Sequence, residues 1–565
     1  MGMLGRRTLV LLLAALSMSV FIAACGGGDD NESDSGGGGG SGEAKNGGSI
    51  TMSQTSQPDF LDPALTYTVN GIEPGWLVYT PLLTYPRTGD EVKDALVIPG
   101  LAKAMPKISK DGQTYELTLR SGLKYSDGSP VKASDFEHEV GRVLNLESGG
   151  SAFFLGITGA QKYVDAGKCD GDISGITADD KTGDIKIHLD APDGSFSNVL
   201  AMWFVGLVPG DTPCKNLTKT PPPGVGPYKV TESVPNRQFV LEKNAKFPDL
   251  GPEIPAGHID KITTKIVKSA ERQAQDVISG ELDYMQDPPP ADIKPEVKAK
   301  YSDRYKEITT ASTYYMFMNT RTPPFDKKEV REAVNWGLDK PALARLFAGE
   351  VAPGCSFLPP GQPGYDKALD TTDCPWGDPN KPPDIEKARQ MIKDAGAAGA
   401  KVTVYGNNDD PTDKVTEAYA DQLNKMGFKA TPKILDGGVY FQTIGSAKEA
   451  PQTGFANWFQ DFPHPKNFFF LVDGKSIQPT NNQNFGNVDD PEITSGIAEL
   501  NKEPTMTDEV AGQWGDLNKK LVERAWIVPY GHRKLATFLS ERMDFDNCSR
   551  FHPVYFNDYS SFCLK

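Results

Sequence analysis

The segment of residues 402–435 constrains the fold of this chain more than any other part of its sequence. Apolar residues alternate in an extended run that starts at Val402, a helical pattern follows over about residues 413–426, and a second extended run covers residues 428–435. This order predicts a strand, a helix and a second strand. Because two parallel strands of one sheet need a crossover of this kind, we predict an α/β fold, at least in the C-terminal half.

Hydrophobic periodicity predicts further elements before that segment. Apolar side chains alternate over residues 114–120 and 185–189, which predicts two half-buried strands. Residues 326–329 read Asp-Lys-Lys-Glu, a capping-box pattern that predicts a helix over residues 327–338. Another helix is predicted over residues 384–395. No internal repeat is visible.

The N-terminus resembles the signal of a bacterial lipoprotein. Arg6 and Arg7 precede an apolar run over residues 9–24, and this run ends in Ile-Ala-Ala followed by Cys25, which resembles a lipobox. The run is shorter than the roughly 20 residues that a membrane-spanning helix needs. We therefore expect residues 1–24 to be a signal peptide and the Cys25 thiol to carry the lipid anchor.

The residues after Cys25 predict a linker followed by a large acidic protein. Residues 25–47 are rich in Gly, Ser and Asp, so they cannot bury apolar surface and should form a flexible linker. The part that follows exceeds what one hydrophobic core usually holds, which predicts at least two domains. The formal net charge of the chain is −16 and no stretch is basic, which argues against nucleic-acid binding.

The other cysteines form three couples that are close in sequence. An even number of cysteines in an exported chain indicates disulfides. No Cys-x-x-Cys motif occurs and the six histidines show no ligand spacing, so we expect no metal site. The expected pairs are Cys169 with Cys214, Cys355 with Cys374, and Cys548 with Cys563.

Several segments in one order resemble extracellular solute-binding protein family 5, the large substrate-binding lipoproteins of oligopeptide, dipeptide and nickel ABC importers. The run LRSGLKYSDGSPV over residues 119–131 is the most specific of them. The other segments are Phe60-Leu61-Asp62-Pro63-Ala64, Ala133-Ser134-Asp135-Phe136, Gly224-Val225-Gly226-Pro227-Tyr228, Ser279-Gly280-Glu281-Leu282-Asp283, Asn319-Thr320, Pro324-Phe325-Asp326 and Arg331-Glu332-Ala333-Val334.

The resemblance implies a two-lobed clamshell of the type II periplasmic-binding-protein class, with an additional inserted domain. Lobe I is expected to be discontinuous and to comprise residues 48–84, 220–308 and 531–565. The inserted domain is expected at residues 85–219 and lobe II at residues 309–530. Each expected disulfide then falls inside one domain, so none of them would hold the lobes together and block a hinge.

The resemblance also implies a function without catalysis. A protein of this kind closes around a peptide and delivers it to an ABC permease in the membrane. We expect a monomer without a cofactor, held at the outer face of the bacterial cell membrane by the lipid on Cys25.

One segment indicates where a peptide would bind. Peptide-binding members share a Trp-x-x-Asp segment whose aspartate pairs with the free α-ammonium group of the peptide, and residues 458–461 read Trp-Phe-Gln-Asp. Asp461 is therefore the candidate anchor, since a carboxylate and an ammonium group form a strong charge-assisted hydrogen bond. Trp458 and Phe459 are candidate ligand contacts, although such aromatic residues also commonly lie in cores.

Other interpretations of this segment and of the ligand stay open. Asp461 could instead accept hydrogen bonds from the backbone of a turn, and His464-Pro465 stands where many relatives have an acidic residue before proline. Arg345, Arg389 and Lys466 cannot be ranked as partners of a ligand carboxylate. The ligand could also be a metal chelate, haem, an oligosaccharide or an antibiotic-like amide. A sensor that presents its solute to a membrane receptor would have the same clamshell.

Enzymes are the rival class. A secreted hydrolase would need an activated nucleophile, but no Gly-x-Ser-x-Gly motif occurs in the chain.

Overall fold

The computed structural model describes residues 45–565 except residues 91–92, 147, 170, 218, 409–410 and 481. The predicted signal peptide, the expected lipidation site at Cys25 and most of the predicted linker lie outside the described residues. No helix in the described part of the chain is long and apolar enough to cross a membrane.

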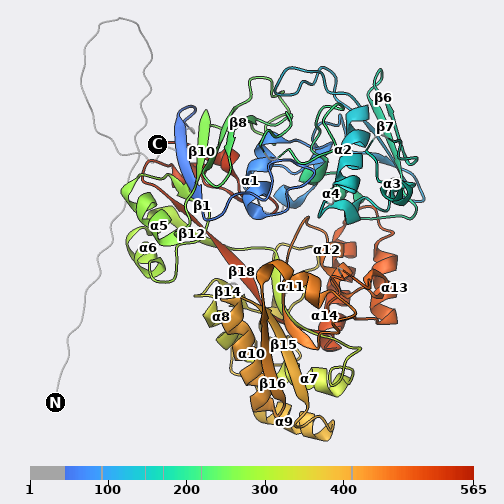
Figure 1. The fold of residues 1–565 in the computed structure, drawn as a ribbon, viewed down its shortest axis with the longest axis vertical. Helices are drawn as coiled ribbons and strands as arrows, with labels where there is room; N and C mark the ends of the chain where they lie inside the picture. Colours follow the sequence, from blue (N-terminus) through green and yellow to red (C-terminus); the bar gives the residue numbers. More distant parts are fainter. Residues whose placement is uncertain are drawn as a thin grey trace, which may run out of the picture. The chain divides into compact units, whose positions relative to one another are not determined.

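Among the described residues, twelve strands form one mixed sheet that runs through both lobes of an α/β fold (Figure 1). Strand β18 (Ile527–Leu539) lies in the middle of this sheet. Its first residues pair with β13 (Ser312–Met318), and Phe538 and Leu539 pair with the short β11 (Tyr284–Met285). Strand β18 therefore joins the two lobes. Below, lobe II denotes residues 310–526, lobe I denotes residues 45–309 and 540–565, and β18 is shared.

Lobe I contains one half of the large sheet and a smaller antiparallel sheet. Its strands in the large sheet are β1 (Ser49–Gln54), β8 (Tyr228–Val234), β9 (Gln238–Lys243), β10 (Lys261–Ile266), β11 and β12 (Tyr305–Thr309). The smaller sheet consists of β4 (Lys107–Ile108), β5 (Thr114–Thr118), β6 (Ile176–Asp179) and β7 (Asp184–His188). The other elements are α1 (Val69–Val78), β2 (Leu83–Thr84), β3 (Ile98–Pro99), α2 (Ser134–Asn145), α3 (Ala160–Ala166), α4 (Phe196–Val199), α5 (Ala270–Ser279), α6 (Lys294–Lys300), α15 (Phe545–Cys548), β19 (Phe551–His552) and β20 (Phe556–Asn557).

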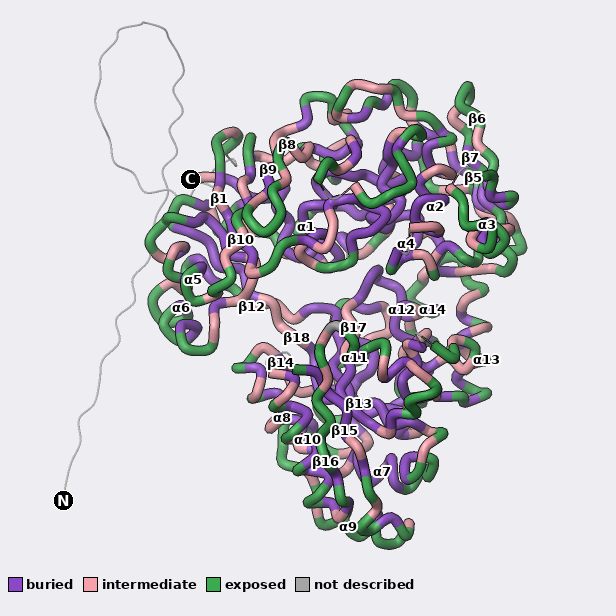
Figure 2. The backbone as a smooth tube through the Cα atoms, in the orientation of Figure 1, coloured by how far each residue is buried: buried purple, intermediate pink, exposed green. Residues whose placement is uncertain are grey.

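Lobe II packs helices against the other half of the large sheet. Its strands are β13, β14 (Val351–Pro353), β15 (Lys401–Asn407), β16 (Lys429–Leu435) and β17 (Thr453–Phe459). Its helices are α7 (Lys328–Gly337), α8 (Lys340–Leu346), α9 (Ile385–Asp394), α10 (Thr412–Met426), α11 (Gly437–Ile444), α12 (Lys466–Phe469), α13 (Pro491–Leu500) and α14 (Asp508–Glu523). The hydrophobic core of lobe II extends from Tyr314 to Tyr530. Strand β13 is buried along its whole length, whereas the edge strand β16 is mostly exposed (Figure 2).

The predicted strand–helix–strand unit is confirmed. Strands β15 and β16 pair in parallel from Lys401 opposite Lys429 to Asn407 opposite Leu435, and α10 connects them. Helix α10 ends at Gly427, whose φ of +107° is a backbone conformation that glycine adopts easily. The two strands predicted from alternation are β5 and β7, and they pair with each other.

The other two helices predicted in lobe II also exist, but the N-terminus of one of them differs from the prediction. Helix α9 is capped as its sequence indicates, because the side chain of Asp384 accepts a hydrogen bond from the amide of Lys387. Helix α7 is not capped by Asp326, so the predicted capping box is wrong. Its N-cap residue is Lys327, whose extended backbone directly precedes the helix and whose side chain makes no capping hydrogen bond. Asp326 stands one position too early for that role.

The three disulfides in the structure are the predicted pairs. Cys169 is bonded to Cys214 with a Cα–Cα distance of 5.9 Å, and Cys355 to Cys374 with the same distance. Cys548 is bonded to Cys563 with a Cα–Cα distance of 5.4 Å. The first and third bonds lie within lobe I and the second within lobe II, so none of them joins one lobe to the other.

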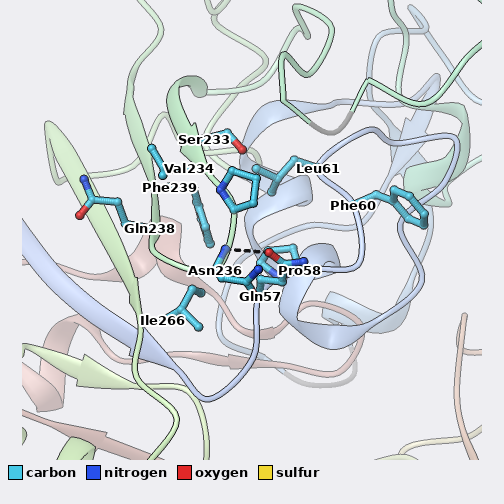
Figure 3. Close-up of a pocket in the computed structure, with 11 residues that line it drawn as sticks. Gln57, Pro58, Phe60, Leu61, Ser233, Val234, Asn236, Gln238, Phe239 and Ile266 are labelled. Carbon is cyan, nitrogen blue, oxygen red and sulfur yellow. Dashed lines mark hydrogen bonds between the residues drawn. The ribbon is translucent and has the colours of Figure 1, made fainter. Parts of the chain in front are cut away.

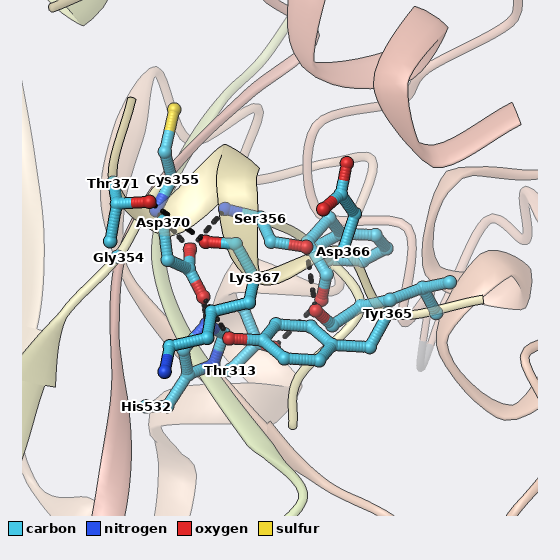
Figure 4. A network of polar contacts seen from close by, with 12 residues as sticks. Thr313, Gly354, Cys355, Ser356, Tyr365, Asp366, Lys367, Asp370, Thr371 and His532 are labelled. Atoms are coloured by element: carbon cyan, nitrogen blue, oxygen red, sulfur yellow. Dashed lines mark hydrogen bonds and ion pairs between the residues drawn. The ribbon is translucent and has the colours of Figure 1, made fainter. Parts of the chain in front are cut away.

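A buried polar network fixes the loop of the second disulfide against β18 (Figure 4). The carboxylate of Asp370 accepts hydrogen bonds from the amides of Cys355 and Ser356 at 2.7 and 2.8 Å and from the hydroxyl of Tyr365 at 2.9 Å. His532 of β18 contacts the same carboxylate at 3.1 Å. Burial acts to raise the pKa of Asp370, but His532 and these hydrogen bonds together lower it. The network ties residues 355–374 to the strand that joins the lobes.

Candidate functional site

Asp461 lies where lobe II meets lobe I. It follows β17 in the loop that leads to α12, and only 6% of its surface is exposed. One carboxylate oxygen accepts a hydrogen bond from the hydroxyl of Tyr67 in lobe I at 2.9 Å. The other oxygen accepts one from the side-chain amide of Asn467 at 2.7 Å. The backbone amide of Asp461 donates to the other end of the Asn467 side chain at 2.8 Å, which fixes the loop.

The carboxylate of Asp461 is buried without a cation. Burial raises its pKa to about 6, and the hydrogen bonds from Asn467 and Tyr67 only partly oppose this effect. Among the described residues, no lysine, arginine or histidine forms an ion pair with Asp461. A buried carboxylate of this kind is costly for the protein to keep charged. A cationic group of a ligand would relieve this cost and gain a charge-assisted hydrogen bond.

Two neighbouring cavities lie at the interface of the lobes, and residues of both lobes line each of them. The smaller has a volume of about 370 Å³ and is lined by Asp461 itself, with Trp458 and Phe459 beside it and Val69 and Ile72 of lobe I opposite. The larger has a volume of about 720 Å³. Residues that line both cavities are Tyr67, Trp458 and Gln483. Cavities of this size and largely apolar lining are typical of small-molecule sites, and here the ligand would be enclosed between the lobes.

The aromatic residues around Asp461 divide into two groups. Trp458 and Phe459 are half-buried and line the cavities, so their rings are available to a ligand. Phe468 and Phe469 are fully buried and belong to the core of lobe II. The indole nitrogen of Trp458 donates to the side-chain oxygen of Asn467 at 3.3 Å, which holds the ring beside the carboxylate.

The cationic candidates differ in their positions. Of the three basic residues that the sequence left unranked, Lys466 alone lines either cavity, and it forms an ion pair with Asp193 of lobe I at 2.7 Å. Arg389 lies on the exposed helix α9 and pairs with Glu386, and Arg345 lies exposed on α8. His464 is buried, and burial lowers its pKa to about 3, so it is neutral at physiological pH.

The sequence did not reveal the residues of lobe I that complete this site. Tyr67, which donates to Asp461, precedes it by 394 positions, and no local pattern connects two residues so far apart. Gln460 makes a second contact between the lobes, since its side-chain amide donates to the backbone oxygen of Pro553. Phe153 and Phe462 lie with their ring centroids 5.8 Å apart across the same interface.

A separate small pocket in lobe I does not belong to this site (Figure 3). It lies between the loop of residues 57–61 and the hairpin of β8 and β9, where the backbone amide of Asn236 donates to the side chain of Gln57 at 2.8 Å. Its volume is about 20 Å³, which is room for a single water molecule. None of its lining residues lines either cavity at Asp461.

Sequence comparison relates the chain to bacterial binding proteins. A family model described as bacterial extracellular solute-binding proteins, family 5, middle part, matches residues 97–479. The chain is 27% identical over 385 residues to the oligopeptide-binding protein OppA of Bacillus subtilis strain 168, covering 65% of this chain and 68% of that protein. It is 28% identical over 342 residues to the glutathione-binding protein GsiB of Salmonella typhi, covering 59% of this chain and 60% of that protein.

Solved structures share the fold. The clavulanic acid biosynthesis oligopeptide binding protein 2 matches with a TM-score of 0.82 and 24% identity, covering 92% of this chain and 96% of that one. DppA of Helicobacter pylori in complex with the peptide STSA matches with a TM-score of 0.71 and 19% identity, covering 92% and 98%. The predicted fold class, a two-lobed α/β structure of type II, is therefore confirmed.

Proposed function

Because the chain belongs to the bacterial extracellular solute-binding proteins of family 5, we propose that it captures peptides between its two lobes and delivers them to an ABC permease. The observation that carries the proposal is the buried carboxylate of Asp461, which lines a cavity between the lobes and has no cation beside it in the described structure. The α-ammonium group of a peptide supplies the missing charge. The relatives named for oligopeptide, dipeptide and glutathione binding support this ligand class.

Closure of the lobes would enclose the peptide. We propose the division of the chain given by the sequence, with lobe I at residues 48–84, 220–308 and 531–565, an inserted domain at residues 85–219 and lobe II at residues 309–530. Support comes from the separate core of lobe II and from β18, which links the lobes and can act as a hinge. In this account Trp458 and Phe459 contact the bound peptide. The chain acts as a monomer and performs no chemical reaction on its ligand.

The test is to identify what the purified protein carries. Native mass spectrometry of the protein as isolated, followed by release and sequencing of the bound molecule, should give short peptides with free N-termini. Recovery of a metal chelate, haem, an oligosaccharide or an N-blocked amide as the bound molecule would contradict the proposal. Recovery of the permease subunits in a pull-down with the full-length protein would support the role in import over one in sensing.

Binding should depend on pH through Asp461. The carboxylate must be charged to hold an ammonium group, and its pKa of about 6 in the free protein means that protonation competes with the ligand in acid. Affinity should be constant between about pH 7 and the α-amino pKa of roughly 8, and should fall about tenfold for each pH unit below 6. Calorimetry across this range measures the profile. An unchanged affinity at pH 5 would contradict a role for the charged carboxylate.

The N-terminus predicts attachment to the membrane. We propose that the lipid on Cys25 and the linker over residues 25–47 hold the protein at the outer face of the cell membrane, since each buried methylene of an acyl chain contributes about 0.8 kcal/mol. A Cys25→Ala variant should then appear in the medium or as an unprocessed precursor. Cell fractionation checks this outcome, and a variant that is still processed and still membrane-bound would contradict lipidation.

A further inference from the structure

The larger cavity beside Asp461 presents aromatic surface from both lobes. Its volume is about 720 Å³. The aromatic residues that line it are Tyr67, Phe153 and Phe196 of lobe I and Trp458, Phe462 and Phe470 of lobe II. Aromatic walls gain most from burying large apolar groups, and they favour a second ring in offset or edge-to-face contact.

The charged residues of this cavity do not offer a free counter-charge to a ligand in its interior. Lys466 and Asp193 pair with each other at 2.7 Å. The remaining acid, Asp190, is exposed and accepts a hydrogen bond from the hydroxyl of Thr158 at 2.7 Å. A charged ligand group that entered the aromatic part would lose its hydration without gaining a partner, which is unfavourable.

The cavity is adjacent to the position where the ammonium group is expected. Tyr67 donates to the carboxylate of Asp461 and lines the larger cavity, and Trp458 borders both cavities. An extended peptide advances about 3.3 Å per residue, so the first two side chains of a peptide anchored at Asp461 lie within roughly 7 Å of this wall.

We propose that the larger cavity selects peptides with a large apolar side chain, preferably an aromatic one, at their first or second residue. This inference rests on the proposed function, because it takes the peptide's ammonium group to be bound at Asp461. Full burial of a ring in place of an alanine methyl group should improve affinity on the order of ten- to a hundred-fold.

A peptide series tests this selectivity on the full-length processed protein. Alanine peptides of three to five residues, with Phe, Leu, Lys or Glu at the first or the second position, are compared by calorimetry. At one of the two positions, Phe should bind roughly ten- to a hundred-fold more tightly than Ala, with Leu between them and Lys and Glu no better than Ala. Equal affinity for Phe and Ala at both positions, or a preference for Lys or Glu, would overturn the inference.

Two variants of one loop test whether the cavity causes the preference. Ala152 is exposed and lines the cavity, whereas Leu155 is exposed on the same loop and does not line it. Ala152→Trp should fill the cavity and bring the ratio of the affinities for the Phe peptide and the all-alanine peptide close to one. Leu155→Trp adds the same ring outside the cavity and should leave the preference intact. If both variants lose the preference for Phe, or if neither does, the larger cavity is not the cause of that preference.

The same series separates this inference from the proposed function. If free peptides bind much more tightly than their N-acetylated forms but no side chain is preferred, the ammonium site stands and the cavity assignment fails. If no peptide in the series binds, the result contradicts the proposed peptide-binding function and therefore also the proposed role of the cavity.

Discussion

Asp461→Asn should weaken peptide binding by roughly thirty-fold to several thousand-fold. The substitution leaves the ammonium group of the bound peptide without its counter-charge at a buried position between the lobes. Removal of one partner from a buried, hydrogen-bonded charge pair typically costs about 2 to 5 kcal/mol, and each 1.4 kcal/mol corresponds to a factor of ten. Calorimetry with one peptide on the wild type and the variant measures the loss.

The stability of the free variant distinguishes this role from a structural one. Burial raises the pKa of Asp461 to about 6, so folding favours its protonated form between about pH 4 and 6. The stability that this group contributes is present at low pH and is lost as the pH rises through 6. Asparagine keeps the shape without the charge, so the variant should be as stable as the wild type at pH 7, or more stable by up to about 2 to 3 kcal/mol. A less stable variant that still binds peptide would show that Asp461 only holds its loop.

Arg142→Leu should cost about 3 to 5 kcal/mol of unfolding free energy. Arg142 lies on α2 and is fully buried, and it donates to Asp62 at 2.6 Å and to Glu139 at 2.8 Å. Burial raises the pKa of Glu139 to about 8, although Arg142 opposes the shift. The substitution therefore leaves Asp62 as a buried carboxylate without its cation, which is strongly destabilising.

A matched arginine on the surface provides the control. Arg389 pairs with Glu386 on α9, and both side chains are at least half exposed. Arg389→Leu should change the unfolding free energy by less than about 1 kcal/mol, because exposed ion pairs contribute little. Urea unfolding of the three proteins gives the comparison. If Arg142→Leu costs no more than Arg389→Leu, the buried cluster does not stabilise lobe I.

Local sequence patterns were sufficient to predict helices and strands that are determined by residues close together in the chain. The order of alternation and helical spacing over residues 402–435 was sufficient to predict β15, α10 and β16, since a parallel pair needs that crossover. Asp384 caps α9 as its position before the helix indicates. The same reasoning placed the start of α7 correctly to within one residue but failed for its cap, because the chain enters the helix through Lys327 rather than Asp326.

The sequence predicted the residues of the site that lie in lobe II but not those that lie in lobe I. Resemblance to peptide-binding relatives singled out Asp461 and its aromatic neighbours, which lie together at the end of β17. Their partners come from distant segments: Tyr67 lies just before α1 and Phe153 follows α2. Contacts between lobes depend on how the whole chain packs, so neither residue carries a local signal. Asp461 is buried and one of its hydrogen bonds comes from lobe I, so its burial and its raised pKa likewise follow from the packing of the whole chain.

The most direct test of the account is a double cycle that combines the Asp461→Asn substitution with N-acetylation of one tightly bound peptide. If Asp461 binds the peptide's ammonium group, acetylation should weaken binding to the wild type about as much as the substitution does. The two changes together should then cost little more than either alone, because both remove the same interaction. Equal binding of free and acetylated peptides to the wild type, or two losses that simply add, would contradict the claim that Asp461 anchors the ligand.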